Sequence, residues 1–235
     1  TYTISTGLTK AGLEATYTDY TFTVGTGTFT ITKADADDLG LSATAYSGEY
    51  DANEHSISAS ATVSEGTTLY YSDVDPESED FEGWSTTNPA YTHVAETPVT
   101  VYVKAENSNY ETAYASATVT ITKKAVTISV ADNGKVYGED DPTLADATMS
   151  GQITGELTAV ALGVTREAGE DVGTYTISTG LTKAGLEATY TDYTFTVGTG
   201  TFTITKADAD DLGLSATAYS GEYDANEHSI SASAT

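Results

Sequence analysis

The chain has 235 residues, enough for one large domain or for two to three small ones, and its formal net charge is −26. A charge of this sign and size repels a phosphate backbone or an anionic lipid surface, so neither nucleic acid nor a membrane is expected as a partner of this segment. The sequence contains no cysteine, which excludes disulfides, thiolate metal sites and a cysteine nucleophile.

A long repeated segment opens the chain. Residues Thr1–Thr62 recur without one change as Thr174–Thr235. Because a catalytic site needs one copy whereas a rod lengthens with every copy, identity at a fixed period favours a linear array. The sequence therefore predicts neighbouring copies of the repeat as partners. Self-association into filaments stays open as well, since alternating Thr/Val strands make competent sheet edges.

Strands are predicted along the whole chain. Apolar and polar residues alternate in segments such as Val99–Val103 and Tyr193–Val197, the period-two pattern of a strand with one buried face. Two similar strands, Thr118–Lys123 and Thr201–Lys206, are interpreted as the ends of modules. The resulting divisions are 1–33, 34–123, 124–206 and 207–235. Short strands with frequent turn residues predict an all-β fold of tandem small β-sandwich modules in a linear array.

An acidic cluster lies where residues 1–33 end and module 34–123 begins, and it recurs in the second copy of the repeated segment. Carboxylate oxygens are the ligands that Ca²⁺ prefers, and an ion shared by consecutive modules would stiffen their joint. The other interpretation is a helix cap or a polar linker. The candidate ligands are Asp35, Asp37, Asp38, Asp208, Asp210 and Asp211.

A weaker candidate calcium site lies in the acidic loop that follows Ser72. This loop lacks the turn glycine of an EF-hand, and a solvated hairpin tip is the other interpretation. Its candidate ligands are Asp73, Asp75, Glu77 and Asp80. No cofactor other than calcium is predicted.

Module 34–123 carries a series of aromatic and turn motifs. They are Tyr46-Ser-Gly-Glu-Tyr50-Asp51, Leu69-Tyr-Tyr-Ser72, Trp84, Asn88-Pro-Ala-Tyr-Thr92, Val99–Val103 and Asn109-Tyr110. In these motifs the module resembles a bacterial Ig-like repeat, from which it departs in its long acidic insert. Trp84 is predicted to anchor the module core near Phe81, with stacking on a sugar ring as the alternative.

A cross-link between a lysine and an asparagine, as in sandwich modules of Gram-positive surface fibres, is a further alternative. The candidates are Lys104 or Lys135 with Asn107 or Asn133. Lys104 alternates with Val101 and Val103, which places it on the solvated face, where this reaction lacks apolar surroundings.

Module 124–206 carries a second, longer series of motifs. They are Lys135-Val-Tyr-Gly138, Asp141-Pro-Thr-Leu144, Gly155-Glu-Leu157, Arg166-Glu-Ala-Gly169, Val172-Gly-Thr-Tyr-Thr-Ile177 and Tyr193-Thr-Phe195. Over nearly its whole length this module resembles the MBG-type domains of large bacterial surface proteins, for which a β-grasp-like variant of the sandwich is the alternative fold. By the same resemblances, residues 1–33 are the C-terminal part of an MBG-type module and 207–235 the N-terminal part of an Ig-like module.

Helical periodicity is hard to find. The segment Ala184–Tyr190 is long enough for about one turn of helix. Gly185 and the flanking threonines favour a loop or a strand there instead.

The two resemblances imply an extracellular protein of the bacterial cell surface, and neither implies an enzyme. The leading hypothesis is a structural segment of a stalk, fibre or adhesin, and the alternative is a module that binds host glycan, mucin or matrix protein with avidity from repetition. Catalysis is not expected, because His55 and His228 are one repeated position, His93 is isolated and Arg166 is the single arginine.

Overall fold

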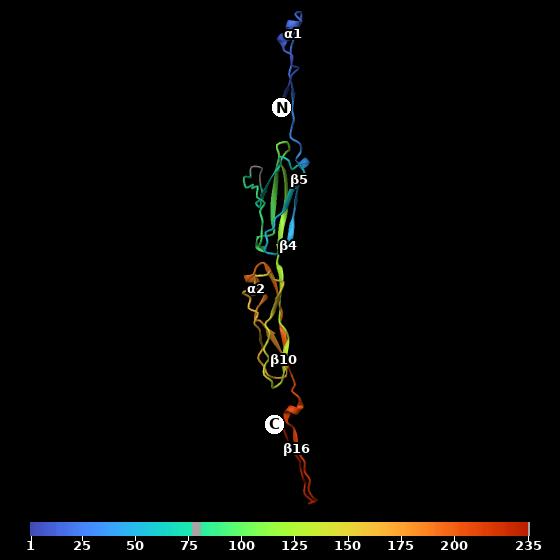
Figure 1. Ribbon diagram of the computed structural model, residues 1–235, viewed down its shortest axis with the longest axis vertical. Coiled ribbons are helices and arrows are strands. Elements are labelled where there is room, and N and C mark those ends of the chain that lie inside the picture. The colour runs from blue at the N-terminus through green and yellow to red at the C-terminus, as the bar shows by residue number, and fades with distance from the viewer. Residues whose placement is uncertain (77–80, 235) are drawn as a thin grey trace. The chain divides into compact units, whose positions relative to one another are not determined.

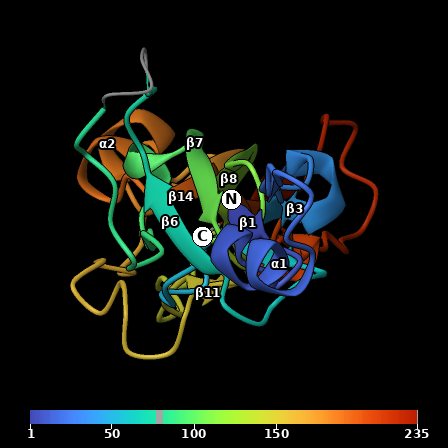
Figure 2. The same cartoon turned by 90° about the horizontal axis from the view of Figure 1, so that it is seen from above.

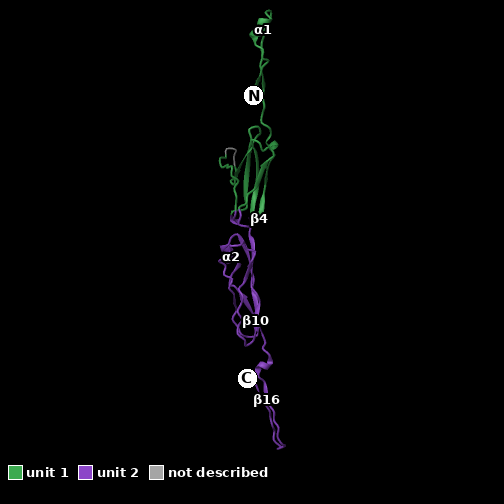
Figure 3. Cartoon of the chain, in the orientation of Figure 1, with its two compact units in different colours: residues 1–47, 54–91, 96–120 green, residues 48–53, 92–95, 121–235 purple. Residues whose placement is uncertain are grey.

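The protein was analysed as a computed structural model that describes residues 1–76 and 81–234. The chain forms two compact units (Figure 3). Unit 1 comprises residues 1–47, 54–91 and 96–120, and unit 2 comprises residues 48–53, 92–95 and 121–235. Unit 2 therefore contains the predicted module 124–206 together with two short segments, 48–53 and 92–95, that belong by sequence to module 34–123.

Two sheets make up most of unit 1. In the smaller sheet, β3 (Leu41–Thr44) pairs antiparallel with β5 (Ser58–Ala61). The larger sheet has the strand order β4 (Tyr46–Glu49), β8 (Ala113–Thr122), β7 (Val99–Glu106), β6 (Thr68–Ser72). Strand β7 pairs antiparallel with both β6 and β8, so it is a central strand with a ladder on each side.

The predicted alternation in β7 is confirmed. Val101, Val103 and Ala105 are fully buried, and Lys104 lies on the opposite face. Ala105 packs in one apolar cluster with Ala113 of β8 and with Leu39, which comes from a short 3₁₀ helix. The same period-two pattern that predicted strands in the sequence thus sets which side chains form the core of unit 1.

Short elements complete unit 1. Strands β1 (Tyr2–Ile4) and β2 (Gly27–Phe29) form an antiparallel pair. The remaining elements of residues 1–120 are α1 (Lys10–Thr16) and the 3₁₀ helices η1 (Ala36–Leu39) and η2 (Val94–Glu96), of which η2 begins within unit 2.

Two larger sheets make up the part of unit 2 that carries α2 and β10 in Figure 1. The three-stranded sheet has the order β11 (Thr148–Ser150), β9 (Lys124–Ser129), β14 (Tyr193–Val197), and the four-stranded sheet has the order β10 (Asn133–Val136), β15 (Gly200–Thr205), β13 (Gly173–Ser178), β12 (Thr165–Arg166). The pairs β9–β14 and β10–β15 are parallel, and the other pairs are antiparallel. Both sheets contribute fully buried apolar residues, which are Val126, Ile128, Ile177, Phe195, Phe202 and Ile204. The all-β fold class is confirmed.

The end of the chain holds three more elements of unit 2. The 3₁₀ helix η3 (Ala209–Leu212) is followed by β16 (Ser215–Thr217) and β17 (Ser231–Ser233), which pair antiparallel. These elements repeat the sequences of η1, β3 and β5.

The prediction of a loop or strand at Ala184–Tyr190 is wrong, because Lys183–Thr189 forms helix α2 beside β14 (Figure 2). Thr182 caps the helix, and its hydroxyl accepts the N–H of Gly185 at 3.2 Å. The buried side chain of Leu186 anchors the helix on the domain. The same segment is helical in α1, where no residue is buried, so the capping threonine outweighs the low helix propensity of glycine and threonine, and Leu186 only fixes α2 on the domain.

Candidate functional site

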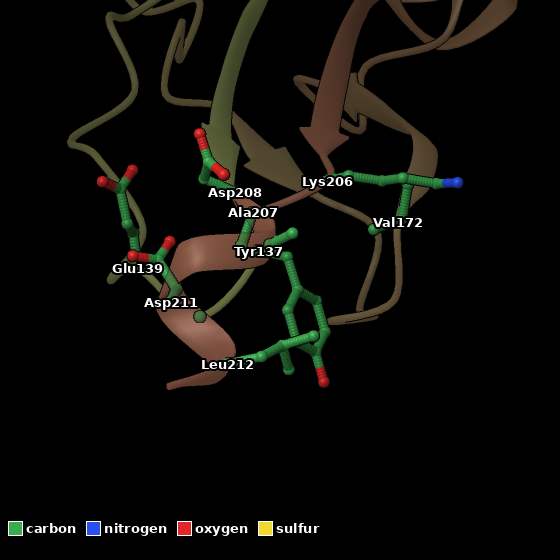
Figure 4. Close-up of a pocket in the computed structure, with 10 residues that line it drawn as sticks. Tyr137, Glu139, Val172, Lys206, Ala207, Asp208, Asp211 and Leu212 are labelled. Atoms are coloured by element: carbon green, nitrogen blue, oxygen red, sulfur yellow. The ribbon is translucent and has the colours of Figure 1, made fainter. Parts of the chain in front are cut away.

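A pocket of about 660 Å³ lies in unit 2 at the start of η3 (Figure 4). The carboxylates of Glu139, Asp208 and Asp211 line it, and the Tyr137 ring and the Leu212 side chain lie next to each other at its lower edge (Figure 4). The pocket is therefore lined by two of the acidic linker residues for which the sequence predicts a calcium site, Asp208 and Asp211.

The structure shows helix capping at the acidic linkers. One carboxylate oxygen of Asp208 accepts the N–H of Asp210 at 3.2 Å, and Asp35 accepts the N–H of Asp37 in the same way at the same distance. Within the described part of the chain, no group of three or more His, Cys, Asp or Glu side chains is arranged to hold a metal ion. Asp38, Asp210 and Asp211 follow the caps in the 3₁₀ helices. Capping is thus the role that the geometry gives Asp35 and Asp208, and calcium binding there stays a prediction.

The weaker acidic site contains two described residues, each of which binds a tyrosine. Asp73 accepts the hydroxyl of Tyr91 at 3.2 Å. Burial and this aspartate raise the pKa of Tyr91 to about 12. Burial, followed by a hydrogen bond to Asp75, raises the pKa of Tyr102. The other two predicted ligands, Glu77 and Asp80, lie outside the described residues.

A second cluster of polar side chains in unit 2 was not predicted from the sequence. We call it the tyrosine–carboxylate cluster, and its members are Tyr50, His93, Glu156, Asp192 and Tyr193. Glu156 accepts hydrogen bonds from both tyrosines, at 3.2 Å from the Tyr50 hydroxyl and 2.5 Å from the Tyr193 hydroxyl. The two tyrosine rings meet edge to face with their centroids 5.5 Å apart, and Tyr50 also stacks on His93. The cluster therefore joins segment 48–53 to residues of module 124–206 through both hydrogen bonds and ring contacts.

Asp192 joins the second segment, 92–95, to the same cluster. One of its carboxylate oxygens lies 2.8 Å from Nδ1 of His93, and the other accepts the N–H of Val94 at 2.8 Å. The main-chain oxygen of Asp192 accepts the N–H of Lys124, the first residue of β9. A single aspartate thus binds both the loop and the start of the central strand of its own sheet.

The surroundings of the two tyrosines keep them as hydrogen-bond donors. Burial, followed by the charge of Glu156, raises the pKa of Tyr50 to about 12. Burial and the hydrogen bond to Glu156 also raise the pKa of Tyr193. Both hydroxyls therefore remain protonated at neutral pH and can donate to the same carboxylate.

The sequence carries no local signal for this cluster. Asp192 lies 98 positions from Val94 and Glu156 lies 106 positions from Tyr50, so only the folded chain brings them together. His93, which sequence reasoning took for an isolated histidine, is one of its members. A search for aromatic and acidic residues shared by both copies of the repeated segment would have included Tyr50 and Asp192 among many others.

Trp84 occupies a different place from the one predicted. It contacts Phe81, as expected, with ring centroids 5.8 Å apart, but it is half-buried and does not belong to the buried core. The Lys104 ammonium lies 5.3 Å from the centroid of the Trp84 ring, and the neighbouring Tyr114 is 54% exposed. The tryptophan therefore packs beside Lys104 and Tyr114, on the face of β7 and β8 opposite the buried core residues.

The lysines proposed for a cross-link are engaged in ion pairs. The Lys104 ammonium lies 2.8 Å from Glu106, and Lys135 contacts Asp141 and Glu170. Asn107 donates to the main-chain oxygen of Glu65. Among the contacts of the described residues, neither lysine ammonium is paired with an asparagine side chain.

Helices that could span a membrane are not found among the described residues. The two histidines of the repeated position, His55 and His228, each stack on a nearby tyrosine, Tyr46 or Tyr219, with ring centroids 4.1 Å apart. Each of these histidines therefore contacts an aromatic ring of its own copy of the repeated segment.

The family model of the MBG domain (YGX type) matches residues 126–203, which lie inside the module expected at 124–206. Residues 126–203 are an MBG domain. The MBG domain supplies Glu156, Asp192 and Tyr193 of the tyrosine–carboxylate cluster. MBG domains occur in bacterial surface proteins.

Several solved structures of multi-domain Ig proteins are similar to the chain at low identity. The I-band fragment I67–I69 from titin is 10% identical, covering 76% of this chain and 65% of that fragment with a TM-score of 0.25. The N-terminal four Ig domains of Dscam1 isoform 8.4 are also 10% identical, covering 70% of this chain and 43% of that structure with a TM-score of 0.23. The chain thus spans less than two thirds of both structures, and similarity at these TM-scores carries no argument about function. A comparison with curated proteins finds no match.

Proposed function

We propose that the chain is a structural repeat segment of an extracellular bacterial surface stalk, fibre or adhesin. One observation carries this proposal: the segment Thr1–Thr62 recurs without change as Thr174–Thr235, and the second copy begins inside an MBG domain, a type of domain that occurs in bacterial surface proteins. Repetition of whole modules extends a projecting structure, whereas it adds nothing to a single catalytic site. The proposal includes no catalytic role.

The partners that follow from this proposal are neighbouring copies of the repeat. Each copy adds the modules of residues 34–206, and their acidic surfaces keep neighbouring modules soluble and apart. Calcium at the linker carboxylates, which include Asp208 and Asp211, belongs to the same proposal as an ion that would offset their mutual repulsion.

Small-angle X-ray scattering on proteins with one, two and three copies of residues 34–206 tests this function. Each protein is measured in calcium and in chelator at matched ionic strength. We expect the maximum dimension to grow linearly with copy number. If calcium stiffens the joints, the maximum dimension of the multi-copy proteins should be smaller in chelator than in calcium. A compact particle whose dimension does not grow with copy number would contradict the structural role.

A glycan-, mucin- or matrix-binding module is the second candidate. It is favoured by one observation, the exposed ring of Tyr114 beside Trp84 on the outer face of unit 1. Repetition would then add avidity in proportion to the number of modules that reach one target. Glycan-array binding that is lost in Tyr114→Ala, together with scattering that shows no linear growth, would favour this candidate over the first.

A further inference from the structure

The two copies of the repeated segment place the same tyrosine in opposite surroundings within unit 2. Tyr50 is 5% exposed, whereas Tyr223, the same residue in the second copy, is 94% exposed. Local sequence cannot cause this difference, because residues 48–53 and 221–226 are identical. The first loop lies against Glu156 and Tyr193 of the MBG domain, and the N–H of Tyr50 is accepted by the main-chain oxygen of Thr122. The second copy of the repeat ends at Thr235, so it includes no counterpart of these three residues for the loop of Tyr223.

The loop itself has one conformation in both surroundings. Ala52 and Ala225 both adopt a left-handed backbone, with φ of 64° and 59°. In both loops an aspartate caps the turn, since Asp51 accepts the N–H of Asn53 at 2.9 Å and Asp224 accepts that of Asn226 at 3.0 Å. A loop that is already shaped without its partner loses little conformational entropy when it is bound.

The MBG domain presents a surface that matches this loop. Glu156 offers two carboxylate oxygens, one of which is bound to Tyr193 and one to the incoming tyrosine hydroxyl. The Tyr193 ring offers an edge-to-face contact, and Asp192, with a side chain only 13% exposed, binds the amide of Val94 in the adjoining segment. The carboxylates of Glu156 and Asp192 accept hydrogen bonds, and the Tyr193 ring adds a buried aromatic contact. Together these groups favour a loop that carries a tyrosine over acidic loops in general.

We propose that Glu156, Asp192 and Tyr193 form a recognition surface of the MBG domain, whose partner is the tyrosine loop of the Ig-like module that precedes it in the chain. Binding of Tyr50 and of segment 92–95 to this surface couples the folding of consecutive modules. The inference rests on the proposed function, because only a tandem array supplies every MBG domain with such a loop.

The repeated segment supplies matched controls for the test, which is amide hydrogen exchange on the full chain. Tyr50→Ala and Asp192→Ala remove members of the cluster, whereas Tyr223→Ala and Asp19→Ala change the same positions of the repeat outside it. Asp192→Ala removes the acceptor of the Val94 N–H, and Tyr50→Ala removes the ring that stacks on the adjacent His93. We therefore expect exchange of the Val94 amide to become roughly tenfold faster in both variants, and Tyr50→Ala is the decisive one because it leaves the acceptor in place. The control pair leaves its exchange unchanged.

Two further measurements separate loss of the loop contact from unfolding of the MBG domain. Exchange of the Ile128 amide in β9 reports whether the MBG domain is still folded, and Tyr50→Phe removes the bond to Glu156 while keeping the ring. Equal Val94 exchange in all variants, or the same acceleration in the control pair, would overturn the inference. Failure of the proposed function is seen separately, as scattering dimensions that do not grow with copy number while the Val94 amide stays protected.

Discussion

Arg166, the single arginine of the chain, binds two carboxylates at once. Its Nε and Nη2 atoms pair with the two carboxylate oxygens of Asp141 at 2.6 and 3.1 Å, and Nη2 also lies 2.7 Å from Glu170. Its guanidinium lies over the Phe202 ring, 4.8 Å from the centroid, and Lys135 contacts the same two carboxylates. The turn around Asp141 is therefore held by a paired network that a lysine in place of Arg166 could not reproduce.

Acid should weaken the MBG domain through this network. Hydrogen bonds from Arg166 and Lys135 lower the pKa of Asp141 to about 2, below the value of about 3.9 for an unfolded aspartate. Since the folded pKa is the lower one, this stabilisation is present above pH 4 and is lost as the pH falls towards 2. We expect the thermal midpoint, followed by circular dichroism, to fall across this window. The fall should be smaller in Asp141→Asn, and it should persist in Asp140→Asn, which removes a neighbouring carboxylate with no ion pair among the described residues.

At the scale of elements, helix α2 stabilises the outer edge of the three-stranded sheet. Strand β14 is the last strand of that sheet, and Glu187 of α2 accepts the main-chain N–H of Phe195 at 3.0 Å and the hydroxyl of Thr194 at 2.7 Å. These two hydrogen bonds lower the pKa of Glu187, the Thr194 hydroxyl contributing more. The helix thus satisfies a strand-edge donor that would otherwise be open to pairing with another chain.

The two copies of this helix should respond differently to the same substitution. Leu186 of α2 is buried in the MBG domain, whereas Leu13, its counterpart in α1, is only half-buried. Leu186→Ala should lower the unfolding free energy by about 2–4 kcal/mol, because it leaves a cavity. Leu13→Ala should change it by less than about 0.5 kcal/mol. Urea unfolding measures both values, and equal effects would show that helix propensity, and not packing, determines the contribution of this leucine.

At the scale of the whole molecule, the dominant property is the net charge of −26. Like charges at this density repel one another and oppose the compact state, although they favour solubility. Part of this repulsion is relieved locally, as at Arg166 and Lys135, but nine basic residues cannot pair with 35 acidic ones.

Salt should therefore stabilise the protein, and the choice of ion separates screening from binding. Sodium chloride up to about 0.15 M shortens the Debye length to about 8 Å, so the thermal midpoint should rise over this range. Calcium chloride at equal ionic strength should raise it further if the linker carboxylates bind the ion. The extra increment should be lost in Asp208→Ala with Asp211→Ala. Identical thermal midpoints in the two salts would show that charge screening accounts for the whole rise, and they would contradict the predicted calcium sites.

Sequence reasoning predicted the all-β class, the alternation in β7 and the MBG domain, because each of these depends on patterns within a short stretch of chain. It missed helix α2, where a cap outweighed propensity, and the position of Trp84 beside Lys104 on the outer face. It also missed the tyrosine–carboxylate cluster, whose members meet only after two sheets have formed. The spacing of these residues along the chain gives no information about this tertiary contact.

The repeated segment separates what the sequence by itself determined from what the tertiary structure decided. Both copies form the same capped helix, α1 and α2, and the same 3₁₀ helix, η1 and η3, because their hydrogen bonds close within four residues. In contrast, Tyr193–Val197 is a strand whereas residues 20–24, identical in sequence, are not. A strand needs a partner for its ladder, and β9 supplies it to one copy alone. Helical turns and caps were thus determined locally, and strand pairing and the burial of Tyr50 only by the fold.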